Sequence, residues 1–187
     1  MVPFAAIFAS AALLACAPVP QPDSFRLVAA VEIPLRTPAD RSDLIAMLRR
    51  HAAADGLHVD DVSAEWQDHQ RNAPELPDFA RGTLYVGVWR GAEDDDLEVS
   101  VDDSGHPGRA WIIFSRGKQP VLATRTRESL LSAIGRRWPG ARRLPVLPTG
   151  GLPLADDLRL SPDGYRIARS AASGYELPAT SPLLAPR

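Results

Sequence analysis

Cys16 is the only cysteine among the 187 residues of the chain. It closes the stretch Leu13-Leu14-Ala15-Cys16, at the end of an apolar run that carries no charged residue. The thiolate of cysteine is a strong nucleophile that can accept an acyl or alkyl group. A single thiol excludes an internal disulfide and a Cys-based metal site elsewhere, so the chemistry to expect of Cys16 is covalent modification.

The stretch resembles the lipobox of bacterial lipoproteins, in which an aliphatic, a tolerated apolar and a small residue precede the cysteine. The apolar run is too short for a membrane-spanning helix of about 20 residues, and it matches the apolar centre of a secretory signal. The resemblance implies that residues 1–15 are removed and that Cys16 receives a diacylglyceryl group and an N-acyl chain such as palmitate. The usual positive charge after Met1 is missing, and the alternative is a short apolar element with a buried free cysteine.

The resemblance also implies where in the cell the protein is located. Each buried CH₂ contributes about 0.8 kcal/mol and one acyl chain anchors only marginally, so several chains would hold the protein on the membrane. We therefore expect a lipid-anchored protein on the periplasmic face of the cell envelope. Ala17 stands where enterobacterial lipoproteins retained in the inner membrane carry aspartate, which favours the outer membrane.

Composition predicts one globular domain. Hydrophobic residues make up 45% and charged residues 24% of the chain, which is ordinary for a packed core. The net charge of −2 gives no general attraction to nucleic acid. We expect a Pro-rich tether over residues 16–24, a single domain over 25–169 and a flexible C-terminal tail over 170–187.

The order of elements predicts an α+β fold. Thr37 and Pro38 are placed to begin a helix that Gly56 ends. A second helix is expected over 127–138, starting at Thr124 or Thr126. Strands are expected at 25–35, 83–90, 97–102, 109–116, weakly at 58–66 and at the edge over 144–147, with a polar loop at 68–79 and a hairpin at 158–167. This order predicts an antiparallel sheet with two helices on one face, ferredoxin-like or a similar two-layer sandwich.

An aromatic set is expected on the other face of that sheet. Side chains alternate along strands, so Tyr85, Trp89, Trp111 and Ile113 would share the face that the helices leave uncovered. An uncovered apolar face marks a binding surface for a partner. The alternative is that the C-terminal segment, including the hairpin at 158–167, folds back over it.

Four arginines gather around the end of the second expected helix: Arg136, Arg137, Arg142 and Arg143. Cations are favoured at a helix C-terminus by the helix dipole, which is a sufficient structural reason for part of the cluster. The same cluster could bind an anionic envelope polymer or an acidic partner protein.

No catalytic, metal-binding or cofactor motif stands out. The four histidines lack metal-ligand spacing, and no G-x-S-x-G elbow is present. The acidic run Glu93-Asp94-Asp95-Asp96 lacks the spacing of a calcium loop. We expect a non-enzymatic module that binds an envelope protein or cell-wall partner, as an immunity or inhibitor protein or an accessory of an envelope complex. The alternative is a small periplasmic hydrolase, which a cleft joining a histidine, a carboxylate and a serine would favour.

A Cys16→Ser protein tests the anchor. It should fail to label with radioactive palmitate and should move to the soluble fraction, because the serine hydroxyl replaces the nucleophilic thiol. The wild-type protein is the control. The lipoprotein interpretation would be contradicted if both proteins were found in the membrane fraction, without label and with residues 1–15 still attached.

Overall fold

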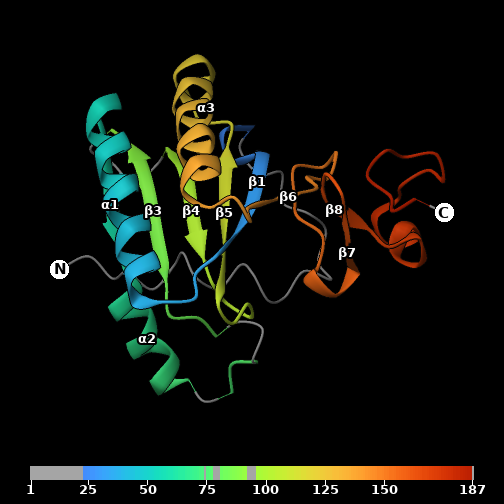
Figure 1. The fold of residues 1–187 in the computed structure, drawn as a ribbon, viewed down its shortest axis with the longest axis horizontal. Helices are drawn as coiled ribbons and strands as arrows, with labels where there is room; N and C mark the ends of the chain where they lie inside the picture. The colour runs from blue at the N-terminus through green and yellow to red at the C-terminus, as the bar shows by residue number, and fades with distance from the viewer. Residues whose placement is uncertain (1–22, 74, 78–80, 92–95, 187) are drawn as a thin grey trace.

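The computed structural model describes residues 23–73, 75–77, 81–91 and 96–186 (Figure 1). Cys16 and most of the expected tether lie outside the described residues. Within the described part of the chain, no helix has both the length and the apolarity needed to span a bilayer.

A six-stranded antiparallel sheet forms the centre of the fold, in the strand order β2-β3-β4-β5-β1-β6. Its strands are β1 (Leu27–Pro34), β2 (Leu57–Asp61), β3 (Tyr85–Arg90), β4 (Leu97–Asp102), β5 (Arg109–Ser115) and β6 (Arg142–Leu144). The consecutive strands β3, β4 and β5 pair as a meander. Strand β1 lies between β5 and β6, so the connections β1-α1-β2 and β5-α3-β6 interleave, as in ferredoxin-like folds.

Helices α1 (Pro38–Asp55) and α3 (Pro120–Arg137) lie on the same face of the sheet (Figure 1). The prediction of an α+β two-layer sandwich is therefore confirmed. Thr37 caps α1 as expected: its hydroxyl accepts a hydrogen bond from the Asp40 amide at 3.1 Å, and the Asp40 carboxylate accepts from the Thr37 amide at 3.1 Å. Gly56 ends the helix with a positive φ of 69°.

The core lies between these two helices and the sheet. Alternate side chains of the strands point toward the helices, and aliphatic side chains from α1 and α3 meet them. The members with the least exposure include Ile33, Leu44, Leu48, Leu84, Val86, Ile112, Phe114, Leu130 and Ile134.

Helix α2 (Ser63–Asn72) replaces the end of the strand expected at 58–66 and the start of the loop expected at 68–79. The helix has no side-chain cap, and Ser63 is its only buried residue. Its stability comes from tertiary contacts. The Gln67 side-chain amide donates to the Thr83 carbonyl at 2.9 Å, and Gln70 exchanges two hydrogen bonds with the backbone of Gly82. These partners are distant in the chain and leave no local pattern in the sequence. The prediction of a strand to residue 66 and a loop from residue 68 was therefore wrong.

Two boundaries also differ from expectation. Helix α3 begins at Pro120, earlier than Thr124 or Thr126, because proline is accepted at the first helical position. The edge strand β6 ends at Leu144, where the sequence predicted it to begin. Its pairing with β1 sets this register, with Ala30 opposite Leu144 and Glu32 opposite Arg142.

The expected hairpin is present as β7 (Leu158–Ser161) and β8 (Gly164–Ile167), a separate two-stranded sheet that contacts β6 (Figure 1). The segment expected to be a flexible tail contains the 3₁₀ helix Arg169–Tyr175. It then returns to β8, where Leu184 is buried and Ile167 exchanges backbone hydrogen bonds with Leu183 and Ala185 at 2.8 Å.

Asp55 joins the two helices at the end of α1. Its carboxylate accepts hydrogen bonds from the Thr126 hydroxyl and the Arg125 guanidinium of α3, both at 2.8 Å. Burial alone would raise the pKa of Asp55. The two hydrogen bonds and the positive charge of Arg125 outweigh burial, so the pKa lies below its ordinary value.

This shift predicts how stability depends on pH. A lowered pKa in the folded state contributes stability above the unfolded value, near 4, and that contribution is lost as pH falls through the folded value. An Asp55→Asn variant should therefore be less stable than wild type at neutral pH, and the difference should shrink below about pH 4. Urea unfolding across that range measures it. Asp60→Asn, at an exposed position of β2, is the matched control, and a difference independent of pH would contradict the assignment.

Candidate functional site

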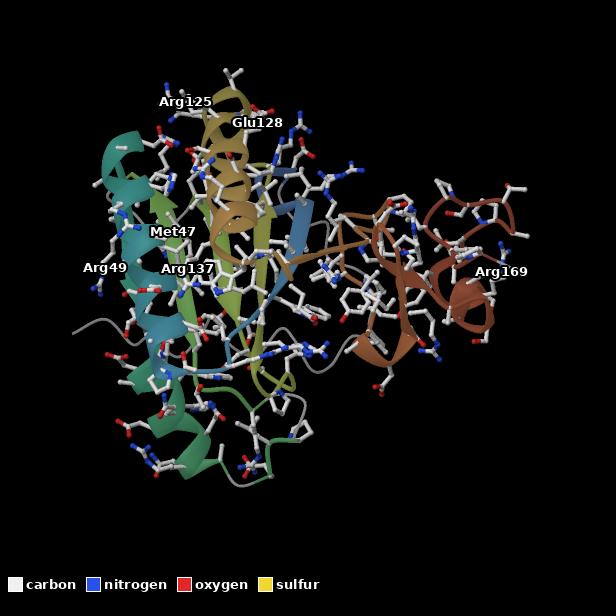
Figure 2. The ribbon with its side chains drawn as sticks, in the orientation of Figure 1. Met47, Arg49, Arg125, Glu128, Arg137 and Arg169 are labelled. Carbon is white, nitrogen blue, oxygen red and sulfur yellow. The ribbon has the colours of Figure 1, made fainter. Side chains whose placement is uncertain are left out.

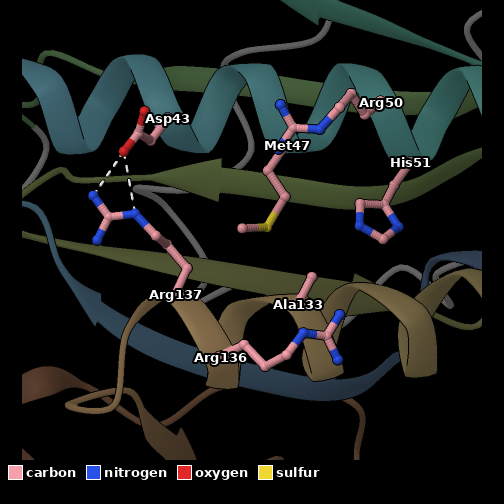
Figure 3. Close-up of a pocket in the computed structure, with 7 residues that line it drawn as sticks. All are labelled: Asp43, Met47, Arg50, His51, Ala133, Arg136 and Arg137. Carbon is pink, nitrogen blue, oxygen red and sulfur yellow. Dashed lines mark hydrogen bonds and ion pairs between the residues drawn. The ribbon is translucent and has the colours of Figure 1, made fainter.

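A hollow of about 520 Å³ lies on the outer side of the helical layer, between α1 and α3 (Figure 3). We call it the interhelical groove. Its lining residues come from both helices: Asp43, Met47, Arg50, His51, Ala133, Arg136 and Arg137.

Helical spacing places these residues together. Positions three and four apart share one face of a helix, so Asp43, Met47 and Arg50 line α1 along two turns. The close pairs Asp43 with Arg137 and His51 with Ser129 show that α3 runs in the opposite direction. Between these pairs, the side chain of α3 that lines the hollow opposite Met47 is the short one of Ala133, and Arg136 lines it beside Ala133.

One of the groove arginines is neutralised. Arg137 donates to the Asp43 carboxylate from Nη2 at 2.6 Å and from Nε at 3.1 Å, and it lies 3.5 Å from Asp40. The hydrogen bond to Asp43 is the main reason that the pKa of Arg137 is raised. Its guanidinium also lies 5.2 Å from the ring centroid of Trp138, within the range of a cation–π contact.

The other two arginines have no carboxylate partner among the described residues. Arg136 donates to the Ser132 hydroxyl at 2.6 Å, one turn back on its own helix. Arg50 is exposed and makes no hydrogen bond or ion pair within the described ranges. Three guanidinium groups and one carboxylate thus line the groove, which gives it a surplus of positive charge.

His51 and Ser129 form a contact of the kind found in nucleophilic catalysis. The Ser129 hydroxyl lies 3.0 Å from Nδ1 of His51, and the serine is exposed. In the part of the chain that the structure describes, no carboxylate bonds to the other ring nitrogen. The third group that would orient the imidazole in a triad is therefore not seen here.

The four predicted arginines fall into two places. Arg136 and Arg137 line the groove (Figure 3), whereas Arg142 and Arg143 are exposed on the edge strand β6. The backbone of Arg143 packs against Gly164 of β8, where an added Cβ would lie 2.6 Å from the Arg143 carbonyl oxygen. The four arginines thus do not line a single pocket.

The aromatic residues do lie on the face opposite the helices. Tyr85 is directly opposite Asp102, which is directly opposite Trp111 on β5. Helix α2 covers part of this face, since the rings of Trp66 and Tyr85 lie 5.8 Å apart. Burial is the main reason that the pKa of Tyr85 is raised. Trp89 packs across Gly87 on the same strand, at a position that an added Cβ would occupy.

The C-terminal hairpin covers the β5 side of that face. Trp111 and Ile113 pack with Tyr165 and with the buried Leu158 in a second hydrophobic cluster. The aromatic set therefore does not form one exposed patch. Of the two alternatives raised by the sequence, the structure favours the covered one for Trp111 and Ile113.

Glu32 holds this cover in place. It is 8% exposed, and its carboxylate accepts hydrogen bonds from Trp111 Nε1 at 3.1 Å, from the Tyr165 hydroxyl at 2.8 Å and from Arg109 Nη1 at 3.0 Å. Burial first, and then the hydrogen bond to Glu32, raise the pKa of Tyr165. The negative charge of Glu32 raises the pKa of Arg109. We call Glu32, Arg109, Trp111 and Tyr165 the Glu32 cluster.

Sequence reasoning missed several of these residues. The spacing of Asp43, Met47 and Arg50 marks a face of the first helix, but nothing along the chain shows that it meets Ala133. Glu32 could have been recognised from the sequence, because it is a charged residue within an otherwise apolar strand and a buried charge needs hydrogen-bonding partners. The described residues contain no group of three or more His, Cys, Asp or Glu side chains arranged to hold a metal ion.

Comparisons with protein-family models, with curated proteins and with solved structures find no match for this chain. The function is therefore argued from the groove and the clusters themselves.

A Tyr165→Phe variant tests the role of the Glu32 cluster in docking the hairpin. It removes the hydrogen bond that Tyr165 donates to the mostly buried Glu32 carboxylate and the one that it accepts from Arg109, which together should cost about 1–2 kcal/mol. Amide hydrogen exchange should speed up in β7 and β8 more than in β3 and β4. Leu160→Ala, at an exposed position of the same hairpin, is the control and should leave exchange unchanged. Equal acceleration in both sheets would contradict local docking.

Proposed function

We propose that this protein is a lipid-anchored lipoprotein of the cell envelope that works by binding a partner protein. The anchor rests on the lipobox resemblance at Cys16, and the periplasmic, outer-membrane address follows from it. The observation that carries the binding role is the interhelical groove with its surplus of positive charge. Immunity or inhibitor proteins and accessory subunits of envelope complexes both act through a surface that binds a partner protein.

The groove favours an acidic segment of a protein over an anionic polymer. Its floor is apolar, because Met47 is 5% exposed and Ala133 is 9% exposed. Methionine adapts its shape to different apolar partners, and grooves between helices commonly receive an amphipathic segment. A chain with an apolar residue for the floor and acidic residues for Arg50 and Arg136 fits both features.

A small hydrolase is the second candidate, and the His51–Ser129 contact favours it. In that reaction the imidazole would take the proton of the Ser129 hydroxyl while the serine oxygen attacks an acyl carbon. The bond to the leaving alcohol or amine would then break, with the imidazolium returning the proton to it, and water would release the acyl group from Ser129. The groove beside the pair would hold the substrate. A Ser129→Ala variant separates the two candidates, because it should abolish ester hydrolysis by a hydrolase, whereas a binding module has no such hydrolysis to lose and should bind its partner as before.

Site-specific photocrosslinking in intact envelopes tests the binding role. A photoreactive residue at position 50 should give one discrete protein adduct, whereas the same residue at position 49 should not. Arg49 is the matched control, because it neighbours Arg50 on α1 but lies outside the groove lining and points away from it (Figure 2). Mass spectrometry should place the crosslink in an acidic segment of the partner.

Charge reversal tests the chemistry of the interaction. The double variant Arg50→Glu with Arg136→Glu should weaken binding of the identified partner by about tenfold or more and reduce its dependence on salt. The control, Arg49→Glu with Arg169→Glu, makes the same change of charge outside the groove (Figure 2). Equal effects of both double variants would show that the groove is not the binding site.

A further inference from the structure

A second hollow, of about 380 Å³, lies on the opposite face of the sheet, where the C-terminal hairpin meets β1 and β5. Volumes above about 300 Å³ are typical of pockets for small ligands. Its walls are the Glu32 cluster, the loop between β4 and β5, and the segment that leads into β7. The lining residues are Glu32, Gly105, His106, Pro107, Arg109, Trp111, Ala155, Leu158 and Tyr165.

Stacked rings form one wall of this pocket. The His106 ring lies on the Trp111 indole with centroids 4.2 Å apart and planes inclined by 21°. The loop that carries His106 is fixed by turns, with the His106 amide bonded to the Asp103 carbonyl and the Arg109 amide bonded to the His106 carbonyl, both at 3.0 Å. Trp111 is itself held by its hydrogen bond to Glu32. The pocket therefore has a flat, preorganised ring surface.

Polar groups with unused hydrogen-bonding capacity lie beside these rings. Both hydrogens of Arg109 Nη1 are used, one for Glu32 and one for the Tyr165 hydroxyl at 2.9 Å. Among the described residues nothing accepts from Nε or Nη2 of Arg109, the edge of guanidinium that donates two parallel hydrogen bonds. The Glu32 carboxylate has four acceptor positions, of which three are filled. Donors and an acceptor are thus held at fixed positions.

The pocket carries almost no net charge of its own. Arg109 and Glu32 neutralise each other at 3.0 Å. Burial lowers the pKa of His106 against the opposing pull of Glu32 and Asp102, which favours the neutral ring. A charged ligand would lose its hydration without meeting a free countercharge. An uncharged ligand rich in hydroxyl groups loses less, because each hydroxyl both donates and accepts.

We propose that this pocket binds an uncharged sugar unit of a saccharide. A pyranose ring has an apolar face of C–H groups, which matches the ring surface of His106 on Trp111, and a rim of hydroxyl groups, which matches the free edge of Arg109 and the open acceptor position of Glu32. The site lies on the opposite face of the sheet from the interhelical groove, and its test is independent of the function proposed for that groove.

Titration with three neutral trisaccharides, triacetylchitotriose, cellotriose and maltotriose, tests the proposal. At least one should bind with a dissociation constant of about 1 mM or tighter, measured by calorimetry. It should also shift the indole N–H resonance of Trp111 in NMR spectra. The cationic chitosan trimer and the anionic trigalacturonate should bind more weakly. Failure of all three neutral sugars, or tighter binding of either charged trimer, would overturn the proposal.

Matched variants locate the binding. His106→Ala should weaken binding about tenfold, whereas His69→Ala should leave it unchanged. His69 is a well-matched control, because its ring also stacks on a tryptophan, Trp66, with centroids 5.4 Å apart, but lies outside the pocket. Arg109→Lys keeps the charge beside Glu32 and removes the Nε–Nη2 edge, so it too should weaken binding with little change in thermal midpoint. Unchanged binding in both pocket variants would place the sugar elsewhere and overturn the assignment.

Discussion

The need to cover both faces of β1 and β5 shapes the rest of the molecule. Helices α1 and α3 cover one face, and the second cluster around Ala30, Leu144 and Leu158 covers part of the other. The Glu32 carboxylate links the sheet to the hairpin through hydrogen bonds. Its burial would be costly without its three donors. The same arrangement that holds the hairpin on the sheet also fixes the walls of the second pocket. Stability and a preorganised binding surface thus have one physical origin.

Polar contacts join the two helices at both ends and near the middle, and the groove lies between two of these contacts. Asp43 meets Arg137, His51 meets Ser129, and Asp55 meets Thr126 and Arg125. Between the first two contacts, Met47 faces Ala133, and the small side chain leaves room. These contacts tie α1 to α3 on either side of the groove. A groove formed before its partner binds lowers the entropic cost of association.

The interhelical groove and the second pocket lie on opposite sides of the sheet, so a ligand in one leaves the other accessible. They differ in electrostatics. The groove has more guanidinium than carboxylate groups on its lining, whereas the pocket balances Arg109 against Glu32. A charged surface speeds and orients the approach of an oppositely charged partner, and a neutral, ring-lined pocket selects by shape and hydrogen bonding.

The sequence by itself determined the elements whose causes are local. Thr37, Pro38 and Gly56 determined the ends of α1, and β-rich runs separated by turn-forming segments predicted β3 to β5. The lipid anchor proposed from Leu13-Leu14-Ala15-Cys16 rests on a local resemblance alone. The sequence also placed Tyr85, Trp89, Trp111 and Ile113 correctly on one face, because alternation is a property of a single strand.

Tertiary structure decided the rest. Helix α2 depends on the backbone of Gly82 and Thr83, the groove on the meeting of Met47 with Ala133, and the pocket on Glu32, Arg109 and Tyr165 converging from three strands. Such partners are distant in the chain, so only folding brings them within hydrogen-bonding range.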